Sequence, residues 1–412
     1  MKKFQKAICL ATAASMVILS LAGCGSKTAP EEIQGTETTG AEDTTEAADA
    51  SGAAADGETF KIGGIGPTTG SNAVYGIAVQ NGIDLAVKEI NAAGGINGYQ
   101  IEYNFQDDEC DNEKSVNAYN TLKDWGMNIL VGSVTSGCCI AVAGNSAQDN
   151  MFQITPSGSS VDCISNNDNV FQVCFTDPNQ GVGAAQYIGT NNVASKVAVI
   201  YDSSDVYSSG IYEKFAGEAA NQSFEIVSAE AFTADNKTDF SVQLQKAKDA
   251  GADLVFLPIY YTEASLILTQ AAAMDYAPKF FGCDGLDGIL GVENFDTALS
   301  EGVMLLTPFA ADAADEATQA FVSAYKAAYN DTPNQFAADA YDAVYIVKAA
   351  VEKSGATPAD SVSDLCEKLK AAMGEISVDG LTGAAMSWDE DGAVNKSPKA
   401  MQITGGNYSL IQ

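Results

Sequence analysis

Histidine is absent from this chain of 412 residues. Histidine is the commonest general base in enzymes and the commonest metal-binding side chain, so its absence excludes a Ser-His-Asp triad and disfavours a zinc site. The absence of histidine makes an enzyme less favoured without excluding one, and we assign no catalytic residue, no metal site and no cofactor.

Positive charge is also scarce, because 21 Lys and Arg residues stand against 54 Asp and Glu residues, which gives a formal net charge of −33. A strongly acidic surface repels nucleic acid and anionic lipid head groups, so we expect no nucleic-acid partner. Hydrophobic residues still make up 46% of the chain, which is enough for a large core and for two lobes.

The sequence contains no apolar run long enough for a membrane span. Its most apolar run lies near the N-terminus and is short. Residues 7–21 are apolar and follow three lysines, which is typical of a secretory signal. The run is short for a membrane span, so we predict a signal peptide over 1–23. The tetrapeptide "LAGC" that ends at Cys24 resembles the lipobox of bacterial lipoproteins, which implies lipidation of this cysteine. An ordinary signal peptide is the alternative.

The next segment, residues 24–58, has no aromatic side chain and holds nine acidic residues against one lysine. Such a segment cannot bury enough apolar surface to fold, and its charges repel one another and extend it. We expect a disordered acidic tether here, with the folded body beginning near Thr59.

From Phe60 onward, patterns typical of strands and helices alternate along the chain. Short apolar runs such as "FKIGGI", "NILVG", "KVAVIY" and "ADLVFLPIY" predict buried strands. Apolar residues at helical spacing predict helices over 75–92, 113–125, 140–149, 180–188, 211–221, 240–249, 264–274, 318–329 and 336–351. The series restarts after "NVFQVCF", so we predict an α/β fold of two doubly wound parallel-sheet lobes. Ligands of such sheets lie beyond the carboxyl ends of the strands.

A glycine-rich turn, "KIGGIGPTTGSNAVYG", follows the first predicted strand and raises the question of a nucleotide. A dinucleotide-binding fingerprint needs a third glycine where Thr69 stands, and a P-loop needs a lysine that is missing after Gly70. Both signatures therefore fail, and the turn is interpreted as an ordinary strand-to-helix connection.

Several segments together resemble the solute-binding proteins of branched-chain amino acid ABC transporters, which are type I periplasmic binding proteins. The matching stretches are "IGGIGPTTGSNAVYG", "GIDLAVKEINAAGGINGYQIEY", "DDECD", "TPSGSS", "FTDPNQG" and "QFAADAYDAVY". The resemblance covers residues 60–412 and implies two lobes joined by three crossovers. Lobe 1 would comprise 60–177 and 309–386, and lobe 2 would comprise 178–308 and 387–412.

The resemblance also implies how a zwitterionic amino acid would be held. The hydroxyl of Ser136, the backbone of Ser157 and the hydroxyl of Ser159 would bind the ligand carboxylate. Glu263, on lobe 2, would pair with the ligand ammonium. The alternatives are purely structural roles. Ser136 would be a helix N-cap, the other two serines would form a polar turn, and Glu263 would be a favourable acid in the first turn of a helix.

Three further residues complete the predicted site. Tyr75 would line the cleft from the opening loop, and Tyr207 would reach it from lobe 2. Asp284 follows a predicted strand and would be either a second ammonium partner or a turn residue.

Seven cysteines remain beyond Cys24, which is an odd number. At least one thiol must therefore stay free or pair outside the chain. The alternative to any disulfide is that all seven are small, mostly buried thiols. The family often joins a cysteine at the place of Cys110 to one just before the pocket serine, but Thr135 stands there. Cys138 and Cys139 are the alternatives for such a bridge.

The resemblance implies a lipid-anchored receptor on the outer face of the cytoplasmic membrane, extracellular in a Gram-positive bacterium. It would capture a branched-chain or similar amino acid and deliver it to the membrane permease of an ABC importer. The alternatives are a binder of another small solute, such as an amide, a urea-like compound or an aromatic acid, and a sensory ligand-binding module.

Overall fold

The computed structural model describes residues 57–411. The predicted signal peptide 1–23, the lipidation site Cys24 and all but the last two residues of the predicted tether 24–58 lie outside these residues. Within the described part of the chain, no helix is long and apolar enough to cross a membrane.

The first sheet is parallel throughout and has the strand order β2-β1-β3-β4-β5. Its strands are β1 (Thr59–Gly66), β2 (Gln100–Asp107), β3 (Ile129–Val131), β4 (Gln153–Thr155) and β5 (Val170–Gln172). The strand order reverses between β1 and β3, and such a switch point opens a crevice at the carboxyl ends of the strands.

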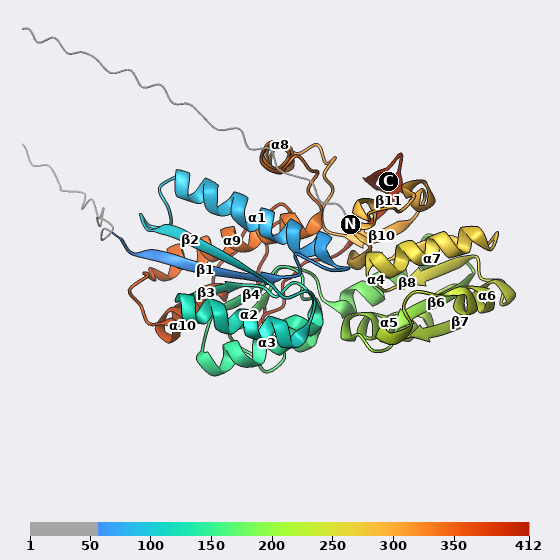
Figure 1. The fold of residues 1–412 in the computed structure, drawn as a ribbon, viewed down its shortest axis with the longest axis horizontal. Coiled ribbons are helices and arrows are strands. Elements are labelled where there is room, and N and C mark those ends of the chain that lie inside the picture. The colour runs from blue at the N-terminus through green and yellow to red at the C-terminus, as the bar shows by residue number, and fades with distance from the viewer. Residues whose placement is uncertain (1–56, 412) are drawn as a thin grey trace, which may run out of the picture. The chain divides into compact units, whose positions relative to one another are not determined.

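Helices cover both faces of this sheet (Figure 1). Helices α1 (Ala73–Ala92) and α9 (Gln335–Ser354) lie together on one face, and α2 (Asn112–Trp125) and α3 (Ser136–Asp149) lie on the other. Helix α8 (Glu316–Tyr329) packs against α1, and α10 (Val362–Met373) packs against α9. Local sequence sets the ends of α2: Asp111 accepts hydrogen bonds from two first-turn amides, and Gly126 ends the helix with φ 91°.

The second sheet has seven strands in the order β12-β11-β10-β9-β8-β6-β7. The parallel strands are β6 (Lys196–Asp202), β7 (Glu225–Phe232), β8 (Leu254–Leu257), β9 (Lys279–Gly282) and β10 (Met304–Thr307). The antiparallel strands β11 (Lys399–Thr404) and β12 (Asn407–Leu410) extend the edge. The parallel part repeats the connectivity of the first sheet, so this lobe also has a switch point, between β6 and β8.

The second sheet is covered on both faces too. Helices α4 (Asp177–Thr190) and α5 (Val206–Ala219) share one buried apolar cluster, and α6 (Ser241–Asp249) and α7 (Tyr261–Ala273) belong to the other. The connections contain the 3₁₀ helices η1 (Val161–Cys163), η2 (Ala234–Asn236), η3 (Asp284–Leu286), η4 (Ile289–Gly291) and η5 (Thr297–Ser300). Two helix-covered parallel sheets confirm the predicted fold class.

The chain passes between the two sheets three times: after β5, after β10 and before β11. The predicted boundary for the last passage lies at 386. Trp388 donates a hydrogen bond from Nε1 to the carbonyl of Gln172 at 2.8 Å, and Lys396 pairs with Asp339 of α9. We therefore propose that lobe 1 extends to Lys396. This segment has no long strand or helix, so its sequence carries no signal for the lobe that it joins.

The glycine-rich turn after β1 is explained by packing. A Cβ atom on Gly76 would lie 1.9 Å from the carbonyl oxygen of Pro67. Because no side chain tolerates that distance, this glycine allows the first turn of α1 to fold back onto the loop before it.

Candidate ligand-binding site

The predicted site residues lie just after the carboxyl ends of strands in both sheets. Ser136 follows β3, and Ser157 and Ser159 follow β4. On the other lobe, Tyr207 follows β6 and Asp284 follows β9. This is the edge at which doubly wound sheets bind their ligands.

Five of the seven predicted residues line one small cavity between the lobes. Its wall consists of Tyr75, Val134, Thr135, Ser136, Ser157, Tyr207, Tyr260, Asp284, Gly285 and Phe336. The cavity volume is about 10 Å³, which is close to the space that a single water molecule needs. An amino acid therefore enters only if the lobes move apart.

Aromatic rings form the apolar part of this wall. The ring of Tyr75 lies 4.3 Å from Phe336 and 4.7 Å from Tyr261, measured between centroids. Tyr207 stacks on Tyr260 with centroids 4.9 Å apart and an interplanar angle of 14°. Such rings supply apolar contact area to a small ligand and keep bulk water out.

The serine side of the cavity presents polar groups at the start of α3. Ser136 is the first residue of this helix, and its Oγ accepts a hydrogen bond from the amide of Ser160 at 3.2 Å. Thr135, not Ser136, occupies the N-cap position. The hydroxyl of Ser157 donates to the carbonyl of Val134 at 2.7 Å, so this side chain is engaged and a ligand would meet the residue through its backbone.

Asp284 brings a carboxylate to the same cavity from the opposite lobe. Tyr207 donates from its hydroxyl to Oδ1 of Asp284 at 2.7 Å, and the amide of Asp284 donates to Gln180 at 3.0 Å. Burial raises the pKa of Asp284 to about 7, although the hydrogen bond from Tyr207 opposes the rise. A cation beside this group would favour its ionised form.

Buried polar groups of two residues that follow β4 and β5 have no hydrogen-bond partner within residues 57–411. They are the hydroxyl of Ser159 and both carboxylate oxygens of Asp177, the first residue of α4. Burial raises the pKa of Asp177. Unpartnered buried groups of this kind are costly, and they are common where a ligand supplies the missing bonds.

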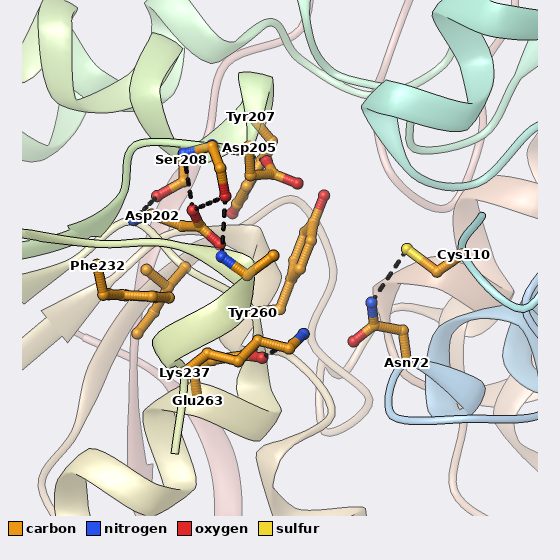
Figure 2. Close-up of a pocket in the computed structure, with 13 residues that line it drawn as sticks. Asn72, Cys110, Asp202, Asp205, Tyr207, Ser208, Phe232, Lys237, Tyr260 and Glu263 are labelled. Atoms are coloured by element: carbon orange, nitrogen blue, oxygen red, sulfur yellow. Dashed lines mark hydrogen bonds and ion pairs between the residues drawn. The ribbon is translucent and has the colours of Figure 1, made fainter. Parts of the chain in front are cut away.

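A second cavity of about 180 Å³ adjoins the first and shares Tyr207 and Tyr260 with it. Figure 2 shows Asn72 and Cys110 from lobe 1 facing Asp205, Lys237 and Glu263 from lobe 2.

Glu263 lines this second cavity and not the first. Its Oε1 pairs with Nζ of Lys237 at 3.0 Å, while the carboxylate is only 5% exposed. The predicted ammonium partner therefore already has a cationic neighbour.

Sequence reasoning missed Lys237, Asp177 and Asp205. Asp205 could have been found, because it lies two residues before Tyr207, after the same strand. Lys237 could not, since it lies on the loop after β7 and meets Glu263 only through the folding of the lobe.

Hydrogen bonds join the lobes at the mouth of the site. Tyr75 donates from its hydroxyl to the carbonyl of Gly285, and the amide of Val74 donates to the hydroxyl of Tyr261 at 3.1 Å. Thr262 donates from Oγ1 to the carbonyl of Ser71 at 2.7 Å. All of the lobe 1 partners belong to the loop and first turn that lead into α1, so this segment is one lip of the site.

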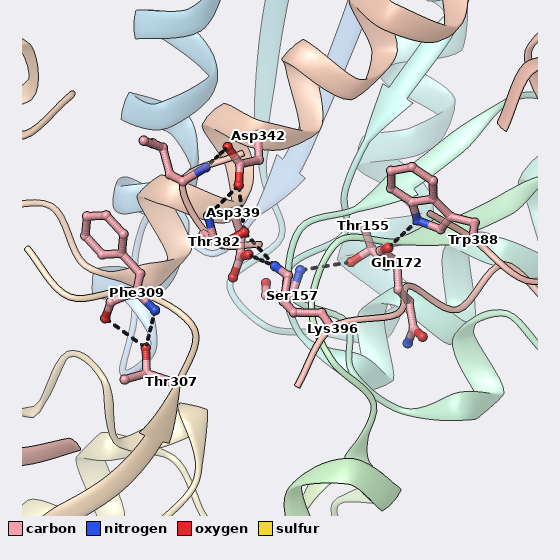
Figure 3. Close-up of polar contacts among 11 residues, drawn as sticks. Thr155, Ser157, Gln172, Thr307, Phe309, Asp339, Asp342, Thr382, Trp388 and Lys396 are labelled. Atoms are coloured by element: carbon pink, nitrogen blue, oxygen red, sulfur yellow. Dashed lines mark hydrogen bonds and ion pairs between the residues drawn. The ribbon is translucent and has the colours of Figure 1, made fainter. Parts of the chain in front are cut away.

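A buried ion pair ties helix α9 to the last passage between the lobes (Figure 3). Nζ of Lys396 lies 2.7 Å from Asp339, and the two side chains are 2% and 3% exposed. Lys396 also donates to Oγ1 of Thr382 at 2.6 Å, and Thr382 donates to Asp342 at 2.6 Å. Phe336 lies one turn before Asp339 on α9, so this network fixes the helix that carries one wall of the site.

All seven cysteines of the described residues are free thiols. Cys110 donates from Sγ to Oγ1 of Thr135 at 3.4 Å and accepts from Nδ2 of Asn72 at 3.1 Å. A single hydrogen bond thus joins Cys110 to Thr135, the residue just before the pocket serine, where the resemblance placed a disulfide.

Comparisons with known proteins agree with this geometry. A family model described as periplasmic binding protein matches residues 59–407. A Leu/Ile/Val-binding protein homolog 3 of Brucella melitensis is 31% identical over 303 residues, which cover 72% of this chain and 79% of that protein. A leucine-, isoleucine-, valine-, threonine- and alanine-binding protein of Pseudomonas aeruginosa is 29% identical over 308 residues, or 74% of this chain and 82% of that protein.

A solved structure is similar as well. It is the branched-chain amino acid transporter substrate binding protein LivJ from Streptococcus pneumoniae, in complex with isoleucine. It superposes with a TM-score of 0.78 at 31% identity and covers 85% of this chain and 98% of its own. Members of the matched family are solute-binding proteins of extracytoplasmic location, which confirms the prediction of a binding protein and not an enzyme. The chain therefore belongs to the type I periplasmic binding proteins, in the family of branched-chain amino acid transporter substrate-binding proteins.

Proposed function

We propose that this chain is the substrate-binding lipoprotein of an ABC importer, which captures an α-amino acid between its lobes and delivers it to the membrane permease. The observation that carries the proposal is the small cavity in which Ser136 and Ser157 face Asp284 across the interlobe space. Hydroxyl and amide donors suit a carboxylate, and an aspartate suits an ammonium ion.

The ligand carboxylate would be bound without arginine, because the sequence contains none. Ser136 lies in the first turn of α3, whose amide groups favour an anion. The unpartnered hydroxyl of Ser159 is a further donor close by. Hydroxyl and amide groups would thus replace a cationic side chain.

The ligand ammonium would bind Asp284 in preference to Glu263. Asp284 lines the same cavity as the serines, whereas Glu263 lines the neighbouring cavity and is already paired with Lys237. This assignment replaces the expectation that Glu263 is the primary partner, and it makes Asp284 the one acid of the zwitterion site.

The N-terminal sequence supports a membrane anchor. The "LAGC" tetrapeptide at Cys24 would be processed and lipidated, and residues 24–58 would hold the folded lobes away from the outer face of the membrane. Metabolic labelling with a fatty acid tests this part: Cys24→Ser should abolish labelling, and a labelled variant would overturn it.

A thermal-shift screen of the mature chain against α-amino acids tests the binding proposal. A ligand at a hundred times its dissociation constant adds about 2.7 kcal/mol to the native state, which shifts the melting temperature measurably. The best amino acid should lose its effect when either its carboxylate or its ammonium group is removed. If no α-amino acid shifts the melting temperature, the proposal fails.

A further inference from the structure

We propose that the second cavity is the side-chain subsite of this protein and that it selects a cationic side chain, of the ammonium or guanidinium type, in place of an aliphatic one. The inference rests on the proposed function, which holds the α-carboxylate at Ser136 and the α-ammonium at Asp284.

The two cavities are neighbours, because Tyr207 and Tyr260 line both of them. The first has a volume of about 10 Å³ and is lined by the groups that would bind the zwitterion. The second has a volume of about 180 Å³, and the stacked rings of Tyr207 and Tyr260 belong to its wall as well. A side chain that leaves the zwitterion site past these rings enters the second cavity.

The charge of the second cavity is negative. Asp202, Asp205 and Glu263 line it, against the single cation of Lys237. Burial raises the pKa of Asp205, and the neighbouring charges of Asp202 and Glu263 add to the rise. An aliphatic side chain would displace water from the cavity and leave the carboxylate charges uncompensated. A cationic side chain would offset these charges.

Two acceptor atoms in this cavity have no donor within the described residues. Glu263 uses only Oε1 for Lys237, and its buried Oε2 has no partner. Asn72, which is 5% exposed, donates from Nδ2 to Cys110, and its Oδ1 has no partner. One acceptor comes from each lobe, so a ligand that donates to both also holds the lobes together.

The class of donor follows from this arrangement. An ammonium group has three N–H donors and a guanidinium group has five, so either can serve acceptors on two sides. Within residues 57–411 no cluster of three or more acidic, histidine or cysteine side chains is placed to hold a metal ion, which favours an organic cation. The faces of Tyr207 and Tyr260 add a surface on which a cation is attracted.

Lys237 does not occupy the position that the ligand would take. Its side chain is 40% exposed and bonds only one oxygen of Glu263. Burial lowers the pKa of Lys237, but the charge of Glu263, its hydrogen bond and the charge of Asp202 together outweigh this effect, and the pKa is raised. The lysine therefore stays cationic and moderates the subsite, while Glu263 keeps one oxygen for the ligand.

The test compares affinities for L-arginine, L-lysine, L-ornithine, L-leucine, L-isoleucine, L-valine and L-glutamate by calorimetric titration of the mature chain. At least one cationic amino acid should bind ten times or more tightly than leucine. Glu263→Gln should weaken its binding at least tenfold and leave any leucine binding within twofold. If leucine or glutamate binds more tightly than every cationic amino acid, the inference fails while the proposed function stands. If no amino acid binds, both fail.

Two further variants separate charge from folding. Asp205→Asn keeps an N-cap for α5, since asparagine caps helices as well as aspartate, and it should weaken the cationic ligand severalfold. Glu230→Gln removes a distant acid of the same lobe that pairs with Lys246 at 2.6 Å, and it should leave every affinity unchanged. An equal loss in Glu230→Gln and Glu263→Gln would show a general charge effect and overturn the subsite.

Discussion

At the residue scale, the two acids on the lobe 2 side of the site differ in what already surrounds them. Asp284 receives a hydrogen bond from a tyrosine and faces the serines, whereas Glu263 is held by a lysine. A carboxylate with a neutral donor gains more from a ligand ammonium than one that is already paired with a cation. The chemistry of each acid therefore depends on its neighbours and not on its place in a motif.

The affinity for an amino acid should depend on pH through Asp284. Burial raises the pKa of this group to about 7 in the protein without ligand, and a bound ammonium would lower it. Below about pH 7 the carboxylate must release a proton before it pairs with the ammonium, so the affinity should fall by up to tenfold per pH unit as the pH is lowered. Titration calorimetry at pH 5.5 and 7.5 measures this.

The control for this prediction is Asp284→Asn, which should bind at least tenfold more weakly and show a flat pH profile between these values. The groups that influence Asp284 are Tyr207, Gln180 and Asp339. A wild-type affinity that is equal at both pH values would contradict the assignment of Asp284.

The buried pair of Lys396 and Asp339 makes a prediction about stability. Lys396→Met would leave Asp339 buried without its cation, and removing one partner of a buried pair costs about 3–5 kcal/mol in the free energy of unfolding. Urea unfolding monitored by circular dichroism measures the change. Lys348→Met is the matched control, because Lys348 pairs with Glu352 on the helix surface, and it should cost less than about 0.5 kcal/mol. Equal losses of unfolding free energy in the two variants would contradict the claim that the buried pair contributes more to stability than the surface pair.

At the element scale, the alternation of strands and helices was predictable and the first turns of several helices were not. Apolar runs located most of the central strands, but β10 was missed. Helices α3 and α5 begin at Ser136 and Val206, earlier than the predicted starts at 140 and 211. The first turn of α3 consists of polar or small residues and carries no apolar stripe. These first turns contain predicted site residues. The helical spacing of apolar residues is therefore least informative at the residues that form the predicted site.

Part of the predicted set of site residues comes together in the structure. The rule that ligands lie after the carboxyl ends of strands, together with the family resemblance, led to five residues that share one cavity. Lys237, the partner of Glu263, could not be predicted from the sequence. It lies on a loop 26 positions away, and no local pattern links the two residues.

Close packing between α1 and α9 makes a prediction for one glycine. A Cβ atom on Gly82 would lie 2.2 Å from the carbonyl oxygen of Ala337 on α9. Because backbone atoms cannot rotate away, Gly82→Ala should force the helices apart and lower the free energy of unfolding by about 1–3 kcal/mol. Chemical denaturation measures this.

Gly144→Ala provides the comparison, since a Cβ atom there meets nothing within 4 Å on helix α3. It should raise stability by up to about 1 kcal/mol, because alanine favours helix more than glycine does. If both variants change stability in the same direction, the packing explanation is wrong.

At the scale of the whole folded part, we expect the closure of the two lobes to control ligand binding. The cavity lined by Ser136 and Asp284 is too small to admit an amino acid unless the lobes separate. Hydrogen bonds such as that from Thr262 to the carbonyl of Ser71 join the lobes at its mouth. Hinge movement of two lobes around a ligand is the motion that such an arrangement allows.

Thr262→Val removes one of these bonds without changing the shape of the side chain. A single hydrogen bond is worth about 1 kcal/mol, so the dissociation constant should rise about fivefold, mainly through faster dissociation measured by stopped-flow fluorescence. Thr269→Val is the control, because the hydroxyl of Thr269 bonds only within α7, to the carbonyl of Ser265 at 2.8 Å. A change of the same size in both variants would remove the role of the interlobe bond.

The central claim, that an α-amino acid lies between the lobes with its ammonium on Asp284, is tested most directly by a crystal structure. The crystals would be grown with the amino acid that raises the melting temperature most. The account predicts the ligand nitrogen within about 3.2 Å of an Asp284 carboxylate oxygen, with the ligand carboxylate at Ser136. A ligand bound elsewhere, or one whose α-ammonium lies on Glu263, would contradict it.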